Sequence, residues 1–224
     1  MITWITFRDE QKAYVDLANN LEESIKVAGA GDFKLIKISP SKTSDIYGEA
    51  LGVGYPVFTE AIEKGPVILL DADHFVHEPV PEFETLNFDL ACSYRGMCEN
   101  EWGEQTYLAG LVVFGNKRKQ RARKLWLEWA MRIYARNPIP KDQEKTATKN
   151  DYFETIGWRR CAYIDQSELN AMMKAPMREC CPRPGKPYSF NGKYVLPLAR
   201  GVYCAKPGTA GAKITHFKGG GKLK

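Results

Sequence analysis

The chain has 224 residues, of which 44% are hydrophobic and 26% charged, and its formal net charge is +5. This apolar content is too high for a disordered chain and indicates a globular protein, which we expect to form a single domain over residues 1–224. No run approaches the roughly 20 consecutive apolar residues of a membrane-spanning helix. No signal-peptide pattern is present at the N-terminus, so we expect a cytoplasmic location, in the host cytoplasm if the protein is viral.

Charge is distributed unevenly along the chain. Residues 1–112 carry 8 Lys and Arg against 19 Asp and Glu, a net charge of −11, whereas residues 113–224 carry 24 against 8, a net charge of +16. An acidic half can hold a cation, and a basic half can meet phosphate groups. The six cysteines include no CxxC pair, so we expect reduced thiols rather than a disulfide framework.

The first part of the chain alternates between strand and helix patterns. Ile2 to Phe7 and Phe33 to Ile38 have the alternation of strands, and apolar residues at every fourth position between them indicate a helix. A second helix is expected at about Tyr55 to Glu63. Val67 to Leu70 follows as a continuous apolar strand, of the kind buried on both faces of a parallel sheet. This order predicts an α/β domain with a mostly parallel central sheet flanked by helices.

Further along, two strand patterns precede a basic helix. The strands are expected at Phe88 to Tyr94 and at Tyr107 to Phe114. The helix is expected at Lys117 to Arg136, with a buried stripe of Leu125, Trp129 and Ile133. Many Lys and Arg residues lie along it, which is typical both of a solvated helix face and of a surface that binds nucleic acid. A nucleic-acid-binding module without catalysis is therefore one alternative function.

Asp71 and Asp73 directly follow the apolar strand. Residues i and i+2 of a strand project the same way, so these carboxylates can converge at the carboxyl end of the sheet, where open α/β domains bind ligands. A divalent cation relieves the repulsion between two close carboxylates. Haloacid-dehalogenase-like phosphatases also have Asp-x-Asp after a strand. Their later acidic pair has no counterpart here, and Phe75 stands where they have Thr or Val, which disfavours that alternative.

Three further segments follow the Asp-Ala-Asp of residues 71–73 in chain order. Residues 108–114 form the strand Leu-Ala-Gly-Leu-Val-Val-Phe, residues 165–170 read Asp-Gln-Ser-Glu-Leu-Asn, and residues 216–222 have the spacing His-x-x-Gly-x-x-Lys. Together the four segments resemble nucleotide-sugar glycosyltransferases with the GT-A fold, in particular the glycogenin and lipopolysaccharide galactosyltransferase type. Residues 165–170 are similar to the Asp-Gln-x-x-Leu-Asn segment of retaining members, and residues 216–222 fit the family's C-terminal pattern.

The resemblance implies both a fold and an activity. The fold would be a GT-A-like domain, with a nucleotide-binding half at about residues 1–115. An acceptor-side half, with the C-terminal metal and diphosphate segment, would occupy about residues 116–224. The activity would be the metal-dependent transfer of a sugar from a nucleoside diphosphate, a UDP-sugar, to an acceptor hydroxyl, with the anomeric configuration retained.

The same resemblance assigns roles to individual residues. The expected ligands of Mn²⁺ or Mg²⁺ are Asp71, Asp73 and His216. His74 and His77 lie where the strand passes into a loop, so we do not expect their side chains to converge with both carboxylates, and neither is an expected ligand. Contacts with the nucleotide sugar are expected from Thr6, Phe7, Asp71, Gly110, Gly219 and Lys222. Asp165 and Gln166 would be the catalytic residues that orient the donor sugar or the acceptor, although Asp165 also suits a helix N-cap.

The acceptor is the most open part of this interpretation. A net charge of +16 in the second half favours a polyanion, and we hypothesise DNA that carries a hydroxymethylated base, as some bacteriophage glycosyltransferases modify. A glycan or a lipid-linked phosphate is the main alternative, because it too would be attracted by positive charge.

Overall fold

A computed structural model describes residues 1–8, 12–38, 46–97, 105–135, 164–173 and 183–217 of the chain. The central sheet consists of β1 (Thr3–Arg8), β2 (Asp32–Lys37), β3 (Val67–Leu70), β5 (Leu90–Met97), β6 (Gln105–Phe114), β7 (Tyr188–Phe190) and β8 (Lys193–Ala199), in the order β2-β1-β3-β6-β5-β8-β7. Strands β2, β1, β3, β5 and β8 run in one direction, and β6 and β7 run in the other. The sheet is therefore mostly parallel, which confirms the predicted α/β architecture.

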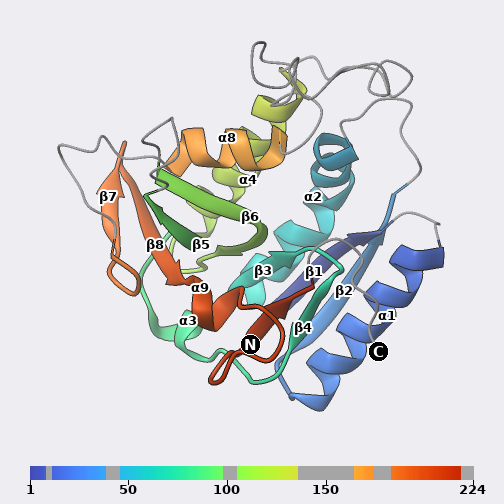
Figure 1. Cartoon of the computed structure of the whole chain (residues 1–224). Coiled ribbons are helices and arrows are strands. Elements are labelled where there is room, and N and C mark those ends of the chain that lie inside the picture. Colours follow the sequence, from blue (N-terminus) through green and yellow to red (C-terminus); the bar gives the residue numbers. More distant parts are fainter. Residues whose placement is uncertain (9–11, 39–45, 98–104, 136–163, 174–182, 218–224) are drawn as a thin grey trace, which may run out of the picture.

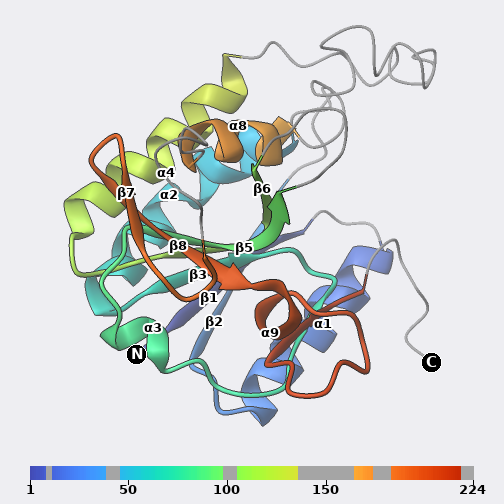
Figure 2. The same ribbon diagram turned by 60° about the vertical axis from the view of Figure 1, so that its left-hand side comes forward.

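Helices cover both faces of this sheet, as Figure 1 shows and the rotated view in Figure 2 confirms. One face is covered by α2 (Ile46–Lys64), α4 (Lys119–Tyr134) and α8 (Ile164–Met173). The other is covered by α1 (Lys12–Val27), α3 (Glu82–Thr85), α9 (Arg200–Tyr203) and a two-stranded ribbon of β4 (His74–Val76) and β9 (Ile214–His216). None of the described helices is long and apolar enough to cross a membrane.

Strand β3 lies between these two layers and contributes to both. Val67 and Leu69 pack in the core on the α2 and α4 side, whereas Ile68 and Leu70 pack in the core on the α1 side. Every residue of β3 is buried, so the strand needs an apolar side chain at each position rather than at every second one. The buried strand expected from the sequence is confirmed, with the same bounds.

Tertiary packing makes α2 longer than its local sequence predicts. The helix begins at Ile46 and contains Pro56, although Gly and Pro are the weakest helix formers and led to a shorter expected helix. Its contacts with α4 compensate for this. The Trp126 indole N–H donates to the carbonyl of Leu51 (2.8 Å), and its ring stacks on Phe58 with the centroids 4.3 Å apart.

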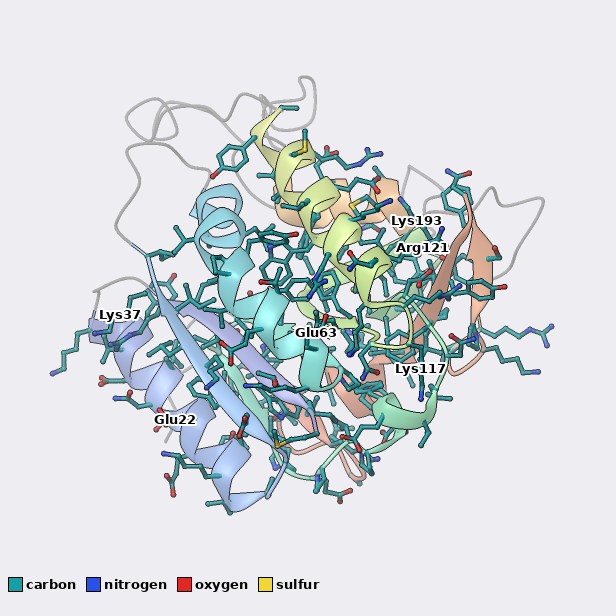
Figure 3. All side chains as sticks on the ribbon, turned by 180° about the vertical axis from the view of Figure 1, so that it is seen from behind. Glu22, Lys37, Glu63, Lys117, Arg121 and Lys193 are labelled. Atoms are coloured by element: carbon teal, nitrogen blue, oxygen red, sulfur yellow. The ribbon has the colours of Figure 1, made fainter. Side chains whose placement is uncertain are left out.

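The basic helix is close to its expected bounds, and its stripe of Leu125, Trp129 and Ile133 is buried as predicted. Its positive charges, however, mostly face acidic partners. Lys119 and Arg123 both pair with Glu63 of α2, at 2.9 and 2.6 Å. Figure 3 shows Glu63 and Arg121 on this side of the molecule. Much of the charge of α4 therefore joins the helix to its neighbours.

A buried carboxylate, Asp89, joins the start of α4 to the sheet. The Arg118 guanidinium lies 2.9 Å from its Oδ1 and 4.2 Å from the centre of the Tyr194 ring, and Arg121 lies 3.6 Å from its Oδ2. The backbone N–H of Tyr194 also donates to Asp89 Oδ2 (2.8 Å). Because the Asp89 side chain is 0% exposed, loss of this charge would leave the arginines without their partner in a region partly shielded from water.

We expect Asp89→Ala to lower the free energy of unfolding by about 3 kcal/mol, the loss that follows removal of one partner of a buried ion pair. Urea denaturation followed by circular dichroism would measure it. Glu22→Ala is the matched control, because Glu22 forms an exposed ion pair with Lys26. Its removal should leave the urea concentration at the unfolding midpoint nearly unchanged. Equal midpoints for the two variants would contradict the assigned role of Asp89.

Candidate functional site

The two predicted carboxylates lie in the short turn that joins β3 to β4. The Asp71 N–H donates to the carbonyl of Gly110 on β6 (3.0 Å), and the His74 N–H donates to the carbonyl of Asp71 (3.3 Å). These bonds place the turn at the carboxyl end of β3, the edge of the sheet where open α/β domains bind ligands.

A second strand brings the C-terminal segment to this turn. Strand β9 pairs antiparallel with β4, and His216 lies opposite His74. The N–H of Phe217 then donates to the carbonyl of Asp73 (2.9 Å). In this register His216 Nε2 lies 3.2 Å from Asp73 Oδ2, although the two residues are 143 positions apart in the sequence.

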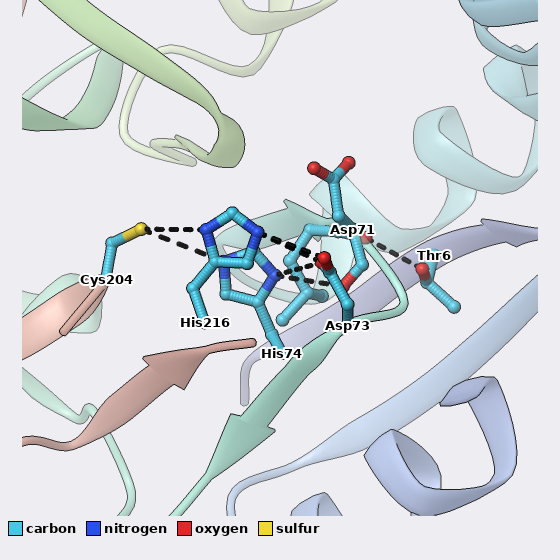
Figure 4. A network of polar contacts seen from close by, with 7 residues as sticks. Thr6, Asp71, Asp73, His74, Cys204 and His216 are labelled. Atoms are coloured by element: carbon cyan, nitrogen blue, oxygen red, sulfur yellow. Dashed lines mark hydrogen bonds and ion pairs between the residues drawn. The ribbon is translucent and has the colours of Figure 1, made fainter. Parts of the chain in front are cut away.

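Asp71, Asp73 and His216 form a group that could hold a cation. One possible ligand atom from each lies within 4.8 Å of the other two. Asp73 Oδ1 is a buried atom without a hydrogen-bond partner, although it lies 3.2 Å from His216 Nε2, within ion-pair range. Figure 4 shows the Asp73 carboxylate directed towards the imidazole of His216. Two carboxylates and an imidazole are suitable ligands for Mn²⁺ or Mg²⁺.

The histidines of the site differ in their affinity for protons. Burial lowers the pKa of His216, but hydrogen bonds to Asp73 and Cys204 outweigh that effect and raise the pKa to about 10. Burial and the adjacent charge of His216 lower the pKa of His74 to about 3. His216 therefore holds a proton beside Asp73, at the place where a bound cation would interact with the same carboxylate.

Solved structures of glycosyltransferases share this architecture. One, involved in the glycosylation of the major capsid of PBCV-1, has a TM-score of 0.54 at 16% identity over 97% of this chain and 93% of that chain. GlyE of Streptococcus pneumoniae TIGR4 has a TM-score of 0.50 at 12% identity, over 98% of this chain and 55% of GlyE. An active-site mutant of LgtC has a TM-score of 0.50 at 12% identity, with coverages of 97% and 87%. The chain has the GT-A fold of glycosyltransferases.

At these identities the likeness concerns the fold alone. No protein-family model matches the sequence, and no curated protein matches it. The roles of single residues in this GT-A domain therefore depend on the local geometry.

Gly110 lies on β6 directly against the Asp71 side chain. A Cβ atom at this position would approach Asp71 Oδ2 to 2.9 Å and His74 Cε1 to 3.3 Å. Both distances are shorter than ordinary van der Waals contact, so a larger residue would displace the carboxylate. The structure thus brings Gly110 next to Asp71, while its predicted contact with a donor sugar stays a prediction.

Thr6 and Phe7, the residues expected beside the nucleotide, point to opposite faces of the sheet. The Thr6 hydroxyl is buried and donates to the carbonyl of Leu70 (2.7 Å), just before the carboxylate turn. The Phe7 ring packs on the side of α2 and α4, 6.5 Å from the ring of Trp126. In this conformation Thr6 supports the end of β3, and contact of either residue with a nucleotide stays a prediction.

The predicted catalytic residues, Asp165 and Gln166, lie in the first turn of α8. This helix is joined to β6 by Asn170, whose side-chain oxygen accepts from the Tyr107 N–H (2.7 Å) and whose side-chain nitrogen donates to the Tyr107 carbonyl (2.9 Å). Asn170, the last residue of the segment 165–170, therefore has a structural role in joining α8 to β6, while the catalytic roles of Asp165 and Gln166 stay predictions. Gly219 and Lys222 lie outside the described residues.

Two residues of the site were not expected from the sequence. The ring of His74 stacks on that of His216 with centroids 4.3 Å apart, and its Nδ1 lies 3.0 Å from the Asp71 carbonyl oxygen, although the group that contains both carboxylates does not include it. Cys204 places its sulfur 3.6 Å from His216 Nδ1. His77 Nε2 lies 2.9 Å from Thr215 Oγ1 and belongs to neither group of possible ligands among the described residues. The pairing of β4 with β9 explains the position of His74, and the end of α9 explains that of Cys204.

We expect Gly110→Ala to displace the Asp71 carboxylate and to weaken Mn²⁺ binding at least tenfold, with little change in melting temperature because a short side chain can move aside. Titration of Mn²⁺ followed by electron paramagnetic resonance would measure the affinity. Gly201→Ala is the matched control, because a Cβ there meets no atom within 4 Å. Wild-type affinity in Gly110→Ala would contradict this role of Gly110.

Proposed function

We propose that this protein is a metal-dependent glycosyltransferase that moves a sugar from a nucleoside diphosphate donor, a UDP-sugar, to an acceptor hydroxyl. The observation that carries the proposal is the group of Asp71, Asp73 and His216 at the carboxyl end of β3 in a GT-A fold. Fold likeness alone would not assign an activity, because one fold can carry several functions.

The residues present fit Mn²⁺ or Mg²⁺. Asp73 Oδ1 is buried without a hydrogen-bond partner, and Asp71 and His216 offer an oxygen and a nitrogen within reach of the same point. When bound, the ion supplies Lewis-acid stabilisation of the negative charge that develops on the leaving diphosphate.

The chain's own residues bind and orient the reactants around that site. Asp71 and Asp73 hold the cation, and Gly110 keeps Asp71 in place from the adjacent strand. Gly219 and Lys222 would bind the diphosphate through backbone N–H groups and a positive charge. Asp165 and Gln166 would orient the donor sugar against the acceptor hydroxyl, so that the reacting atoms start close together. We expect retention of the anomeric configuration.

The acceptor hypothesis has less support from α4 than its composition suggested. Lys119 and Arg123 are paired with Glu63, and the tryptophans that could have stacked on bases, Trp126 and Trp129, are buried. These contacts also weaken the case for a nucleic-acid-binding module built on α4. DNA with a hydroxymethylated base remains our proposed acceptor, with a glycan or lipid-linked phosphate as the alternative.

A screen of nucleotide sugars tests the proposed activity. Hydrolysis or transfer is measured with Mn²⁺, with Mg²⁺ and without either ion. Labelled sugar is also offered to hydroxymethylated and unmodified duplex DNA at about 50 mM salt, where phosphate contacts are strong. Metal-dependent turnover of a UDP-sugar supports the transferase. Labelling of neither duplex, without DNA binding, overturns the DNA acceptor alone. Absence of turnover with every donor and with either metal overturns the whole proposal.

We expect Asp73→Asn to abolish Mn²⁺-dependent donor binding and to lower turnover by at least 100-fold, because the amide keeps the shape and removes the charge. Isothermal titration with UDP and Mn²⁺, together with a hydrolysis assay, would measure both effects. Asp16→Asn on the exposed face of α1 is the control for loss of one carboxylate and should behave as wild type. Unchanged turnover of Asp73→Asn at saturating Mn²⁺ would refute the metal assignment.

Truncation after Phe217 tests the predicted diphosphate contacts. It removes Gly219 and Lys222 and leaves β9 intact, whereas an earlier cut at Thr215 would remove a buried residue and the partner of β4. We expect at least tenfold weaker UDP binding with unchanged Mn²⁺ affinity. A single Lys222→Ala substitution should reproduce part of the loss. Wild-type UDP affinity in the truncated chain would be inconsistent with a diphosphate-binding role.

A further inference from the structure

A second group of possible metal ligands lies beside the first and shares His216 with it. It consists of His74 on β4, Cys204 at the end of α9 and His216 on β9, and one ligand atom from each lies within 4.8 Å of the others. Figure 4 shows the sulfur of Cys204 facing the edges of both imidazole rings. The sulfur lies 3.9 Å from His74 Nε2 and 3.6 Å from His216 Nδ1.

In each imidazole, the nitrogen that does not face the Cys204 sulfur lies within hydrogen-bond distance of an oxygen. His74 Nδ1 lies 3.0 Å from the carbonyl oxygen of Asp71, and His216 Nε2 lies 3.2 Å from Asp73 Oδ2. If each of these nitrogens carries the proton, His74 Nε2 and His216 Nδ1 present their lone pairs towards the sulfur. Histidines that ligate metals have this arrangement, in which an oxygen acceptor fixes the tautomer and orients the ring.

While His216 carries a proton on both ring nitrogens, its Nδ1–H can donate to the Cys204 sulfur and the thiol can donate to His74 Nε2. A metal ion that replaces the Nδ1 proton leaves both rings neutral, and in that state hydrogen bonds alone satisfy the group poorly. A thiol donates one proton, so Cys204 can serve one of the two nitrogens and leaves the other without a donor from this sulfur. Both His74 and Cys204 are buried, at 3% and 4% exposure, where an unmet acceptor is costly. One cation bound to the sulfur and to both nitrogens would satisfy all three atoms.

We propose that His74, Cys204 and His216 form a zinc site. A thiolate and two imidazoles are the ligand types that favour Zn²⁺ over the harder Mn²⁺ and Mg²⁺. Tetrahedral bond lengths of about 2.3 Å to sulfur and about 2.0 Å to nitrogen place these ligand atoms roughly 3.5 Å apart. The observed separations of 3.6 and 3.9 Å need only a small contraction. The stacked rings would also have to tilt, so that both lone pairs point at the ion.

This site would regulate the activity proposed above, on which this step rests. Zinc at His216 Nδ1 leaves Nε2 protonated and bonded to Asp73, so the imidazole no longer offers Nε2 to an ion held by Asp71 and Asp73. The two sites therefore compete for one histidine. Zn²⁺ would weaken Mn²⁺ binding without displacing Mn²⁺ from the carboxylates directly.

Cobalt titration tests the site without any nucleotide sugar. Co²⁺ bound to a thiolate gives a charge-transfer band in the near ultraviolet, and we expect this band in the wild-type protein at one equivalent. Cys204→Ser should lose it. Cys92→Ser, which removes the other buried free thiol among the described residues, should keep it. A band of wild-type intensity in Cys204→Ser, or no band in the wild type, would overturn the zinc site.

Two further measurements keep the proposal testable if Cys204→Ser does not fold. X-ray absorption of zinc bound to the wild-type chain should show one sulfur among nitrogen neighbours, and either no sulfur or several would contradict the site. In the Mn²⁺ titration, one equivalent of Zn²⁺ should lower the affinity for Mn²⁺ at least tenfold in wild type and in Cys92→Ser. A cobalt band without sugar transfer would leave the zinc site standing and refute only the proposed activity.

Discussion

The pairing of β4 with β9 is the interaction on which the site depends. Strand β4 continues directly from the carboxylate turn, and β9 comes from the opposite end of the described chain, so three residues on each strand join distant parts of the sequence. A shift of this register by one residue would turn the side chain of His216 to the other face of the ribbon. The Phe217 N–H bond to the Asp73 carbonyl and the Ala205 carbonyl bond to the His216 N–H help to fix the register.

Strands β1, β2, β3, β5 and β6 could be predicted from the sequence because each carries its own signal, whereas the three-residue strands β4 and β9 are too short to show one. The buried run of β3 and the alternation of β1 are local patterns that packing on both sides of the sheet reinforces. The full length of α2 could not be predicted, since its glycines and Pro56 oppose a helix and its packing on α4 and on the sheet stabilises it. Local propensity is a weak guide where tertiary packing supplies most of the stability.

The candidate site was predictable to a similar, limited extent. Asp71 and Asp73 follow a strand signal, and His216 belongs to a motif, so their types and order could be recognised. His74 and Cys204 have no such signal. His74 is turned into the site by its strand pairing with His216, and Cys204 by the end of a four-residue helix. The protonation behaviour of the two histidines also depends on burial and on mutual contact, neither of which a sequence displays.

The uneven charge of the two halves has a structural explanation that does not require a polyanionic partner. Glu63 pairs with Lys119 and Arg123, Asp89 with Arg118 and Arg121, and Glu82 with Lys213. In each case an acid from the first half meets bases from the second. The same division recurs at the site, where the first half supplies both carboxylates and the second supplies His216. Part of the charge asymmetry thus joins the two halves across the fold, and only the remainder is available to attract an acceptor.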